Sequence, residues 1–184
     1  WAWDFDNDGN TDSKEPNPTY TYSTEGTYTV SLTVSDGINQ YTRTLENYIY
    51  GLTNSSDILV VNGIDYSNAT YIPEMQAFYN SSSCFGNHNV DVWDLFGNQG
   101  FNYSANTSFQ NVHLFNRNIP NSVLNLYDKV IWIGNNFSGD LAFFNPAQVI
   151  QYVQNGGNFL LATRLGSNFF NTELRNYCGI LSFT

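Results

Sequence analysis

The sequence predicts two domains of different fold class: a small all-β sandwich over residues 1–50 and a parallel α/β domain over residues 57–184. Short alternating runs rich in Thr, Tyr, Ser and Val fill the first part, which is the pattern of half-buried strands. The second part alternates continuous apolar runs with amphipathic segments, which is typical of parallel strands joined by helices. Between them, GLTNSS at residues 51–56 has the composition of a linker.

The overall charge argues against two classes of partner. Six basic residues against sixteen acidic ones give a formal net charge of -10, which disfavours nucleic acid and an anionic membrane surface. The same charge suits a cation. No apolar run is long enough to span a bilayer, so we expect no membrane insertion of this segment. The sequence begins without Met and inside a predicted strand, so we expect it to be a piece of a longer chain.

The strands of the first domain are predicted from alternation and turn residues. WAWDFD opens the chain and places aromatic side chains on one face of a strand and acidic side chains on the other. DGNTD then ends the strand with turn chemistry. Residues 28–34 and 41–45 are two further strands, and the hairpin signal SDG follows the first of them.

Two motifs of this region resemble a known family. WDFDNDGNTDS, followed by NPTYTYSTEGTYTVSLTVSDG, resembles the PKD domain, an immunoglobulin-like β-sandwich, and both motifs occur in the family's order and separation. The resemblance implies a secreted or cell-surface spacer or adhesion module that is not itself catalytic. It also implies strands before Trp1, so we expect this domain to be incomplete at its N-terminal end.

Oxygen-bearing side chains recur at alternate positions of the acidic stretch: Asp4, Asp6, Asp8, Asn10 and Asp12 match positions 1, 3, 5, 7 and 9 of an EF-hand loop. A strand precedes them and prolines follow, so we do not expect the helices of an EF-hand. Calcium needs only six to eight hard oxygens, and the sequence therefore predicts a structural Ca²⁺ site with the aspartates as side-chain ligands and Asn10 binding through its carbonyl. The alternative is a solvated acidic turn whose Asp side chains cap backbone amides.

The second domain is predicted to alternate strands and helices. The strands are expected over residues 57–63, 90–96, 129–135 and 158–164, and the helices over residues 73–79, 145–156 and 171–177. The helix over residues 145–156 has the clearest boundaries, since Asn145 is a cap, Pro146 lies in the first turn and Gly156 ends it. Residues 97–111 are predicted to be a long loop.

The order of DILVVNG, VDVWDLF, KVIWIGN and QYVQNGGNFLL resembles a flavodoxin-like sheet, and in particular the class I glutamine-amidotransferase-like superfamily. Enzymes of that superfamily carry a Cys or Ser nucleophile at a sharp elbow between a strand and a helix, with a His later in the chain. Here the fourth strand is followed by TRLGSNF, which contains no GxCxG or GxSxG. The resemblance therefore implies a member that lacks the catalytic elbow.

Ligands collect at the carboxyl ends of the strands in open α/β sheets. A ligand pocket is therefore predicted from the polar residues at these ends, with Arg164 as the group that would recognise a sugar or a carboxylate. The residues are Asn62, Asp65, Asp94, Asn135 and Arg164. The alternative is that these side chains satisfy the backbone groups of nearby loops.

Six Asn-x-Ser/Thr sequons are compatible with surface glycosylation of an exported protein, although a chain this rich in Asn, Ser and Thr is expected to contain several by chance. They begin at Asn54, Asn68, Asn80, Asn102, Asn106 and Asn136. Cys84 and Cys178 lie in no metal or redox spacing, so a disulfide and two separate thiols both remain open.

These observations favour a non-catalytic extracellular segment of a larger multidomain surface or secreted protein, serving adhesion, spacing or assembly with other domains or subunits. One alternative is an accessory part of a secreted peptidase or other hydrolase whose catalytic residues lie outside this segment. Another is a glycan-binding module. Because all four tryptophans fall in predicted strands, the exposed aromatic residues that a glycan needs would have to come from residues 97–111.

Overall fold

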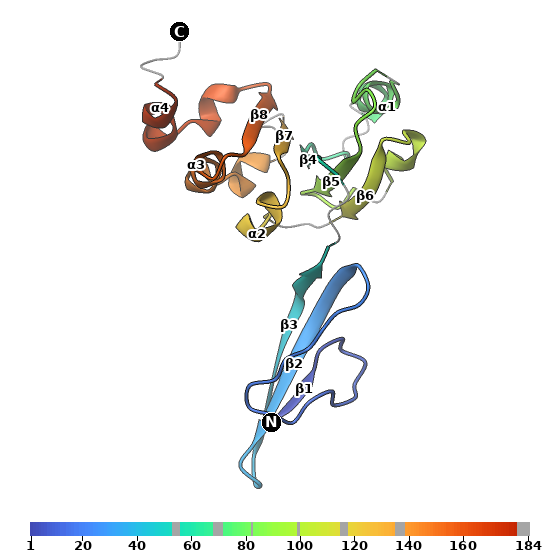
Figure 1. Ribbon diagram of the computed structural model, residues 1–184, viewed down its shortest axis with the longest axis vertical. Helices are drawn as coiled ribbons and strands as arrows, with labels where there is room; N and C mark the ends of the chain where they lie inside the picture. The colour runs from blue at the N-terminus through green and yellow to red at the C-terminus, as the bar shows by residue number, and fades with distance from the viewer. Residues whose placement is uncertain are drawn as a thin grey trace. The chain divides into compact units, whose positions relative to one another are not determined.

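The computed structural model describes residues 1–52, 56–67, 72–81, 83–98, 100–114, 118–134 and 139–179. The chain divides into two compact units, Trp1–Thr53 and Asn54–Thr184 (Figure 1). The first unit contains strands only, and the second combines a sheet with helices. Among the described residues, no helix has the length and apolar character needed to cross a membrane.

The first unit is a three-stranded antiparallel sheet. Its strands are β1 (Ala2–Asp4), β2 (Gly26–Ser35) and β3 (Gln40–Gly51), in the order β1-β2-β3. In the turn between β2 and β3, Asp36 Oδ1 accepts the N–H groups of Ile38 and Asn39 at 2.9 and 2.7 Å. The predicted antiparallel β class is confirmed, and the described residues of this unit form one sheet of the expected sandwich.

Aromatic rings form a row on the first unit. The row runs through Trp3, Phe5, Tyr20, Tyr22 and Tyr28, with 4.1 to 5.7 Å between successive ring centroids. Phe5 is buried in this row. Trp1, which the alternation also assigned to the core, is 57% exposed. The core prediction is therefore wrong for Trp1, which precedes the first residue of β1 and lies outside the row.

The second unit contains a five-stranded parallel sheet. Its strands are β4 (Ile58–Gly63), β5 (Val90–Asp94), β6 (Phe109–Leu114), β7 (Lys129–Gly134) and β8 (Asn158–Thr163), in the order β6-β5-β4-β7-β8. The predicted parallel α/β class is confirmed. When β4 to β8 are numbered 1 to 5 along the chain, their order across the sheet is 3-2-1-4-5. Flavodoxin has the order 2-1-3-4-5. The comparison with flavodoxin therefore holds for the layers and strand directions, and not for the place of the third strand.

Helices follow the strands, largely where the sequence predicts them. The α-helices are α1 (Ile72–Asn80), α2 (Asn121–Leu124), α3 (Pro146–Gln154) and α4 (Thr172–Cys178), and the 3-10 turns are η2 (Tyr103–Ala105), η3 (Asp140–Phe143) and η4 (Gly166–Phe169). Asn145 Oδ1 accepts the N–H of Ala147 at 3.1 Å and so caps α3. Asn171 caps α4 in the same way through the N–H of Leu174, at 2.8 Å.

The helices pack on both faces of the sheet. Tyr79 of α1 and Tyr103 of η2 lie in one hydrophobic cluster with Val60 of β4. On the opposite face, Phe144 packs against Trp132 of β7, with 5.1 Å between ring centroids. Helices therefore cover both faces of the parallel sheet, with α1 near β5 and β6, and α3 near β8 (Figure 1).

Residues 97–111 differ from the prediction. They contain η2 and the start of β6, where the sequence predicted a long loop. Phe101, Tyr103 and Phe109 are 7%, 4% and 9% exposed and pack against Tyr79. The aromatic side chains that the glycan-binding alternative needed on the surface therefore lie in the core.

Candidate metal site

The acidic loop folds back against β1. The N–H of Trp3 donates to the carbonyl of Ser13 at 2.8 Å, and the N–H of Asp12 donates to the carbonyl of Trp3 at 2.7 Å. Between these bonds, Asn7 and Gly9 have positive φ values of 59° and 88°, and glycine adopts this conformation without a Cβ clash. The loop is therefore held by β structure, as predicted, rather than by a pair of helices.

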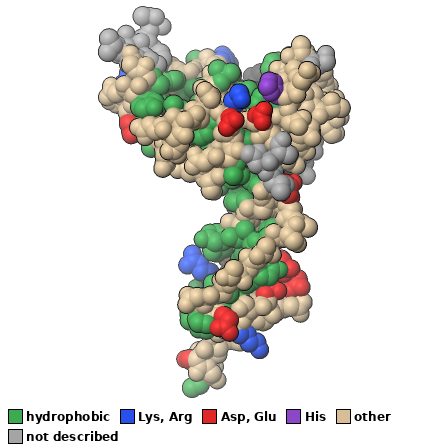
Figure 2. Space-filling view, in the orientation of Figure 1, with side chains coloured by type: hydrophobic (Ala, Val, Ile, Leu, Met, Phe, Trp, Pro, Cys, Tyr) green, Lys and Arg blue, Asp and Glu red, His purple; other side chains and the backbone are tan. Residues whose placement is uncertain are grey.

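Three aspartates converge in this loop. Asp4, Asp6 and Asp8 each offer a carboxylate oxygen, and the three oxygens lie within 4.8 Å of one another. Ligands on opposite sides of a calcium ion are also about 4.8 Å apart, because each Ca–O distance is about 2.4 Å. Figure 2 shows a group of acidic side chains on the right of this unit, with others at separate places on it. The spacing of the three oxygens therefore fits a single hard cation.

Hydrogen bonds determine which of these oxygens are available. Asp4 Oδ2 accepts the N–H of Gly9 at 3.0 Å, whereas Asp4 Oδ1 is buried and receives no hydrogen bond. Asp4 as a whole is only 9% exposed. Asp6 uses Oδ1 to accept the N–H of Asp8 at 3.3 Å. Because a buried carboxylate oxygen without a donor is costly, Asp4 Oδ1 is the atom that a cation would stabilise most.

Asn10 holds the third carboxylate in place. Its backbone N–H donates to Asp8 Oδ1 at 2.8 Å, and its Nδ2 donates to Asp8 Oδ2 at 2.9 Å. These two bonds, the side-chain bond first, lower the pKa of Asp8, which keeps its carboxylate charged. Each oxygen retains a lone pair for a metal. The role of Asn10 as a carbonyl ligand stays a prediction.

Asp12 is the predicted side-chain ligand that does not join the converging carboxylates. Its Oδ2 accepts the N–H of Phe5 at 2.6 Å, and Asp12 is not part of the group of three converging carboxylates. Asp4, Asp6 and Asp8 also accept backbone N–H groups, so this bond does not exclude Asp12, and its role as a ligand stays a prediction. Of the five predicted ligands, the structure thus brings together the side chains of three.

The charge of the loop affects two tyrosines beside it. Loss of hydration raises the pKa of Tyr20, and the negative charges of Asp12, Asp6 and Asp8 raise it further. Burial likewise raises the pKa of Tyr22, followed by the charges of Tyr20, Asp12 and Asp6. The phenol of Tyr22 donates to the carbonyl of Phe5 at 2.9 Å. These phenols therefore lie within the negative field in which a cation would bind.

Of the predicted strand-end residues that the structure describes, Asn62 and Asp94 come together, and Arg164 lies apart from them. Asn62 and Asp94 meet at the ends of β4 and β5, where Asn62 Nδ2 donates to Asp94 Oδ2 at 3.3 Å. Asp65 lines a shallow surface pocket of 340 Å³. Arg164 follows β8, and three strand spacings of about 4.8 Å separate β8 from β5. Asn135 lies outside the described residues.

Asp94 is fully hydrogen bonded inside the protein. Its carboxylate is buried and accepts bonds from Tyr103 Oη at 2.6 Å, from Asn98 Nδ2 at 2.8 Å and from the N–H of Phe96 at 2.9 Å. Asn62 Oδ1 accepts the hydroxyl of Tyr66 at 3.2 Å. These bonds join the ends of β4 and β5 through side chains, and only the bond from Phe96 is of the kind that the alternative describes. The sequence gives no signal that Tyr103 and Asn98 bind Asp94, because only the tertiary structure brings them together.

The described sequons differ in exposure. Asn80 and Asn102 are exposed. Asn106 is 8% exposed, its Nδ2 donates to the carbonyl of Tyr79, and its Oδ1 accepts the N–H of Ser108 at 2.9 Å. The other three sequons begin outside the described residues, at Asn54, Asn68 and Asn136. A glycan on Asn106 would have to displace the internal bond of Nδ2.

Both cysteines are free thiols, Cys84 half-buried and Cys178 exposed, so the structure contains no disulfide between them.

Comparison with known proteins gives one match. The chain matches the PKD domain family over residues 1–49, and neither a curated protein nor a solved structure matches it. The matched residues include the acidic loop, β1, β2 and most of β3. PKD domains are typically extracellular and occur as parts of multidomain proteins. Residues 1–49 of this chain are therefore a PKD domain, followed by a parallel α/β domain.

Proposed function

We propose that this chain is a non-catalytic extracellular segment of a larger multidomain surface or secreted protein, and that it serves adhesion, spacing or assembly with a structural calcium ion in its PKD domain. Its partners are other domains or subunits of the same assembly. The observation that carries the calcium site is Asp4 Oδ1, a buried oxygen without a hydrogen-bond donor, beside the carboxylates of Asp6 and Asp8. Glycans on the exposed residues Asn80 and Asn102 belong to the same proposal.

The ion would stiffen the module where the loop meets the sheet. Asp4 is the last residue of β1, whereas Asp6 and Asp8 belong to the loop, so one ion joins the two. Extracellular calcium sites of this kind bind at about 10⁻⁴ to 10⁻³ M. Such a site is filled outside the cell and empty at the far lower calcium concentration of the cytosol. A spacer gains rigidity on export in this way.

Calorimetric titration of the full chain with Ca²⁺ tests the site. We expect binding by the wild type and its loss in the double variant Asp6→Asn, Asp8→Asn. Asp36→Asn is the matched control, because Asp36 is also an exposed turn aspartate that accepts backbone N–H groups, but it lies outside the group of converging carboxylates. A wild type without binding heat, or a double variant that binds as well as the wild type, would remove calcium from the proposal.

Stability gives a second measurement. Calcium at ten times its dissociation constant stabilises the folded domain by about 1.4 kcal/mol, which raises the Tm of so small a domain by several degrees. Magnesium should stabilise it less, because Mg²⁺ demands strict octahedral geometry and gives up its water reluctantly. Equal shifts with both ions in the wild type and in the double variant would indicate a general salt effect instead of a site.

A further inference from the structure

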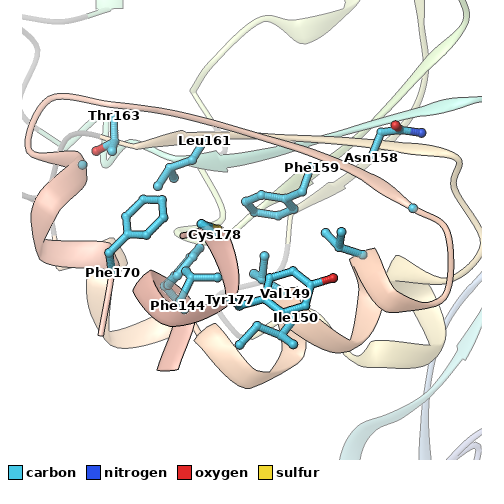
Figure 3. A pocket seen from close by; sticks show the side chains of 14 residues that line it. Phe144, Val149, Ile150, Asn158, Phe159, Leu161, Thr163, Phe170, Tyr177 and Cys178 are labelled. Carbon is cyan, nitrogen blue, oxygen red and sulfur yellow. The ribbon is translucent and has the colours of Figure 1, made fainter. Parts of the chain in front are cut away.

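Two pockets of the second unit differ in charge. The first, of 540 Å³, lies between β8 and the helices α3 and α4, and none of the described residues that line it carries a formal charge (Figure 3). The second, of 340 Å³, is lined in part by the acidic residue Asp65. Both volumes fall within the range of about 300 to 1,000 Å³ that is usual for small-molecule sites. Asp65 gives the second pocket a preference for one sign of charge that the first pocket lacks.

The pocket beside Asp65 lies at the carboxyl-terminal edge of the sheet. Its walls come mainly from two connections, residues 65–67 after β4 and the described residues between 96 and 101 after β5. This edge is where open α/β sheets bind their ligands. Asn98 joins the two connections, because its Oδ1 accepts the N–H of Tyr66 at 2.9 Å and its Nδ2 donates to the carbonyl of Ile64 at 2.9 Å. The fold therefore holds the walls of this pocket in place without a ligand.

The charge of the pocket is negative. Among the described residues that line it, Asp65 alone carries a formal charge. Its side chain is half-buried, and its Oδ1 accepts the N–H of Ser67 at 2.8 Å, which leaves lone pairs of the carboxylate for a further donor. The first turn of α1 begins at the lining residue Ile72 and carries a second acid, Glu74. The pocket therefore favours a cation over an anion.

The other walls are apolar and aromatic. Phe96 and Ile72 are half-buried lining residues, and the lining residues Tyr66 and Phe101 stack with 4.4 Å between their ring centroids. An ammonium group is attracted to aromatic rings, and the aliphatic stem of a charged side chain packs on apolar surface while its charged end stays near water. One carboxylate beside such walls is therefore complementary to an amine on a short aliphatic chain.

We propose that this pocket binds a primary alkylammonium group, which donates N–H groups to the Asp65 carboxylate and lays its aliphatic chain against Phe96 and Ile72. A free amine and a lysine side chain both carry this group. The proposal goes beyond the spacer function and does not depend on calcium. It also differs from the sugar or carboxylate that the sequence predicted at the strand ends, because Arg164 is not among the residues that line this pocket.

NMR titration of the full chain tests the proposal with three ligands of similar shape and different charge, n-butylammonium, 1-butanol and butyrate. The amide signals of residues 65–67, Gly97 and Asn98 report the pocket. n-Butylammonium should bind about fivefold more tightly than 1-butanol, and butyrate should bind most weakly, because Asp65 repels it. Raising NaCl from about 20 to 200 mM should weaken n-butylammonium binding and leave 1-butanol binding unchanged, because salt screens exposed charges.

A second titration distinguishes the two sources of the ammonium group. Nα-acetyl-lysine amide carries the lysine side chain without a free α-amino group. Its binding at the affinity of n-butylammonium or higher would assign the pocket to lysine side chains, and a clearly weaker response would assign it to free amines. The proposal stands in either case, provided that n-butylammonium moves the signals of the pocket.

Asp65→Asn keeps an acceptor for the Ser67 N–H and removes the charge, so it should weaken n-butylammonium binding about threefold to fivefold. Asp36→Asn is the matched control, because Asp36 accepts the N–H of Ile38, also two positions ahead, and belongs to the PKD domain. It removes the same charge and should leave the response of the pocket unchanged. Phe96→Leu keeps an apolar wall without the ring and should weaken n-butylammonium binding about twofold.

Three results would overturn the proposal. The first is a wild type in which no amine moves the signals of the pocket. The second is 1-butanol binding that is as tight as n-butylammonium binding. The third is an Asp65→Asn variant with unchanged β4 signals, and hence an intact fold, that binds n-butylammonium as tightly as the wild type.

Discussion

Tyr103 donates a 2.6 Å hydrogen bond to the carboxylate of Asp94, and both side chains are buried. Asp94 ends β5, whereas Tyr103 begins η2 on the way to β6. At 2.6 Å, it is a short hydrogen bond between two oxygen atoms. This bond ties the connection between two strands to the end of one of them, in a stretch whose sequence suggested only a loop.

Replacing Tyr103 by Phe should destabilise the α/β domain by about 1 to 3 kcal/mol, because Asp94 then lacks one donor in a site that water does not reach. Urea denaturation measures the loss. Tyr177→Phe is the control, since Tyr177 is 44% exposed and its change should stay within about 0.5 kcal/mol. Equal stability of the two variants would mean that the other donors to Asp94 compensate fully.

The buried tyrosines predict a loss of stability at alkaline pH. Burial, followed by nearby charges that include Asp94, raises the pKa of Tyr66, Tyr79 and Tyr103 above the ordinary value of 10.0. Below pH 10 both states keep these protons, so stability does not depend on them. Above pH 10 the unfolded chain releases protons that the folded domain retains, and the free energy of unfolding falls by about 1.4 kcal/mol per pH unit for each tyrosine.

Urea titrations at several pH values from 9 to 11.5, followed through the NMR signals of β4, measure this slope. Tyr103→Phe should make this fall less steep by about 1.4 kcal/mol per pH unit, because one group that the folded domain keeps protonated is gone. A wild-type stability that stays flat above pH 10 would show that these phenols ionise in the folded domain as readily as in the unfolded chain.

Gly134 is required by the close approach of Asp140. The space where a Cβ of Gly134 would lie is occupied by Asp140 Oδ2, and a Cβ on Gly63 of the adjacent strand would lie 2.9 Å from the Asp140 Cβ. Gly134→Ala should therefore destabilise the domain by about 1 to 3 kcal/mol through overpacking. Gly100→Ala is the control, because no atom lies within 4 Å of its added Cβ.

A loss of stability in Gly134→Ala has two explanations, the overlap with Asp140 and a change in the backbone at residue 134. The double variant Gly134→Ala, Asp140→Gly distinguishes them. If the overlap with Asp140 is the cause, the second substitution removes the clash and the two effects are not additive. Additive losses in thermal denaturation would instead assign the effect of Gly134→Ala to the backbone.

Local signals predicted the elements that carry their own boundaries. The run Ile58–Val61 is apolar throughout and forms the buried central strand β4. Asn145 and Pro146 start α3 where the sequence places it, because a cap and a first-turn proline act within a few residues. The acidic loop is likewise predicted from nearby residues, since Gly9 and its neighbours specify a turn.

Features that depend on distant partners could not be predicted in this way. The sequence does not predict the strand β6, because FQNVHL lacks the apolar run of a buried strand. Such a polar sequence is tolerated at the edge of a sheet, where only one side is paired. The strand order and the separation of Arg164 from Asp94 depend on crossovers that the sequence does not specify. Spacing alone predicts Asp12 as a ligand, and it does not reveal that the fold keeps this carboxylate outside the converging group and on the N–H of Phe5.

The sequons make a prediction about glycosylation. After secretion from a glycosylating host, peptide mass spectrometry should find glycans on Asn80 and Asn102, which are exposed, and not on Asn106, whose amide is bonded inside the domain. Asn102 and Asn106 lie in the same short segment, so a transferase that reaches one of them has equal access to the chain around the other. Each residue is therefore the control for the other. A glycan on Asn106 of the folded protein would contradict the buried position of its side chain.

Substitutions of Asp12 and Asp6 should separate two roles of the acidic loop, which are its contribution to stability and its binding of calcium. Asp12→Ala removes the acceptor of the Phe5 N–H and should lower the stability of the calcium-free PKD domain by about 1 kcal/mol, less than a buried charged bond because Asp12 is exposed. Its calcium affinity should change only severalfold, through lost long-range charge. Asp6→Asn should instead weaken calcium binding strongly and leave the calcium-free stability the same or higher, because repulsion among the carboxylates decreases.

Denaturation in a chelator and calorimetry with Ca²⁺ measure the two effects. Strong loss of calcium affinity in Asp12→Ala would return Asp12 to the ligands and show that the loop rearranges around the ion.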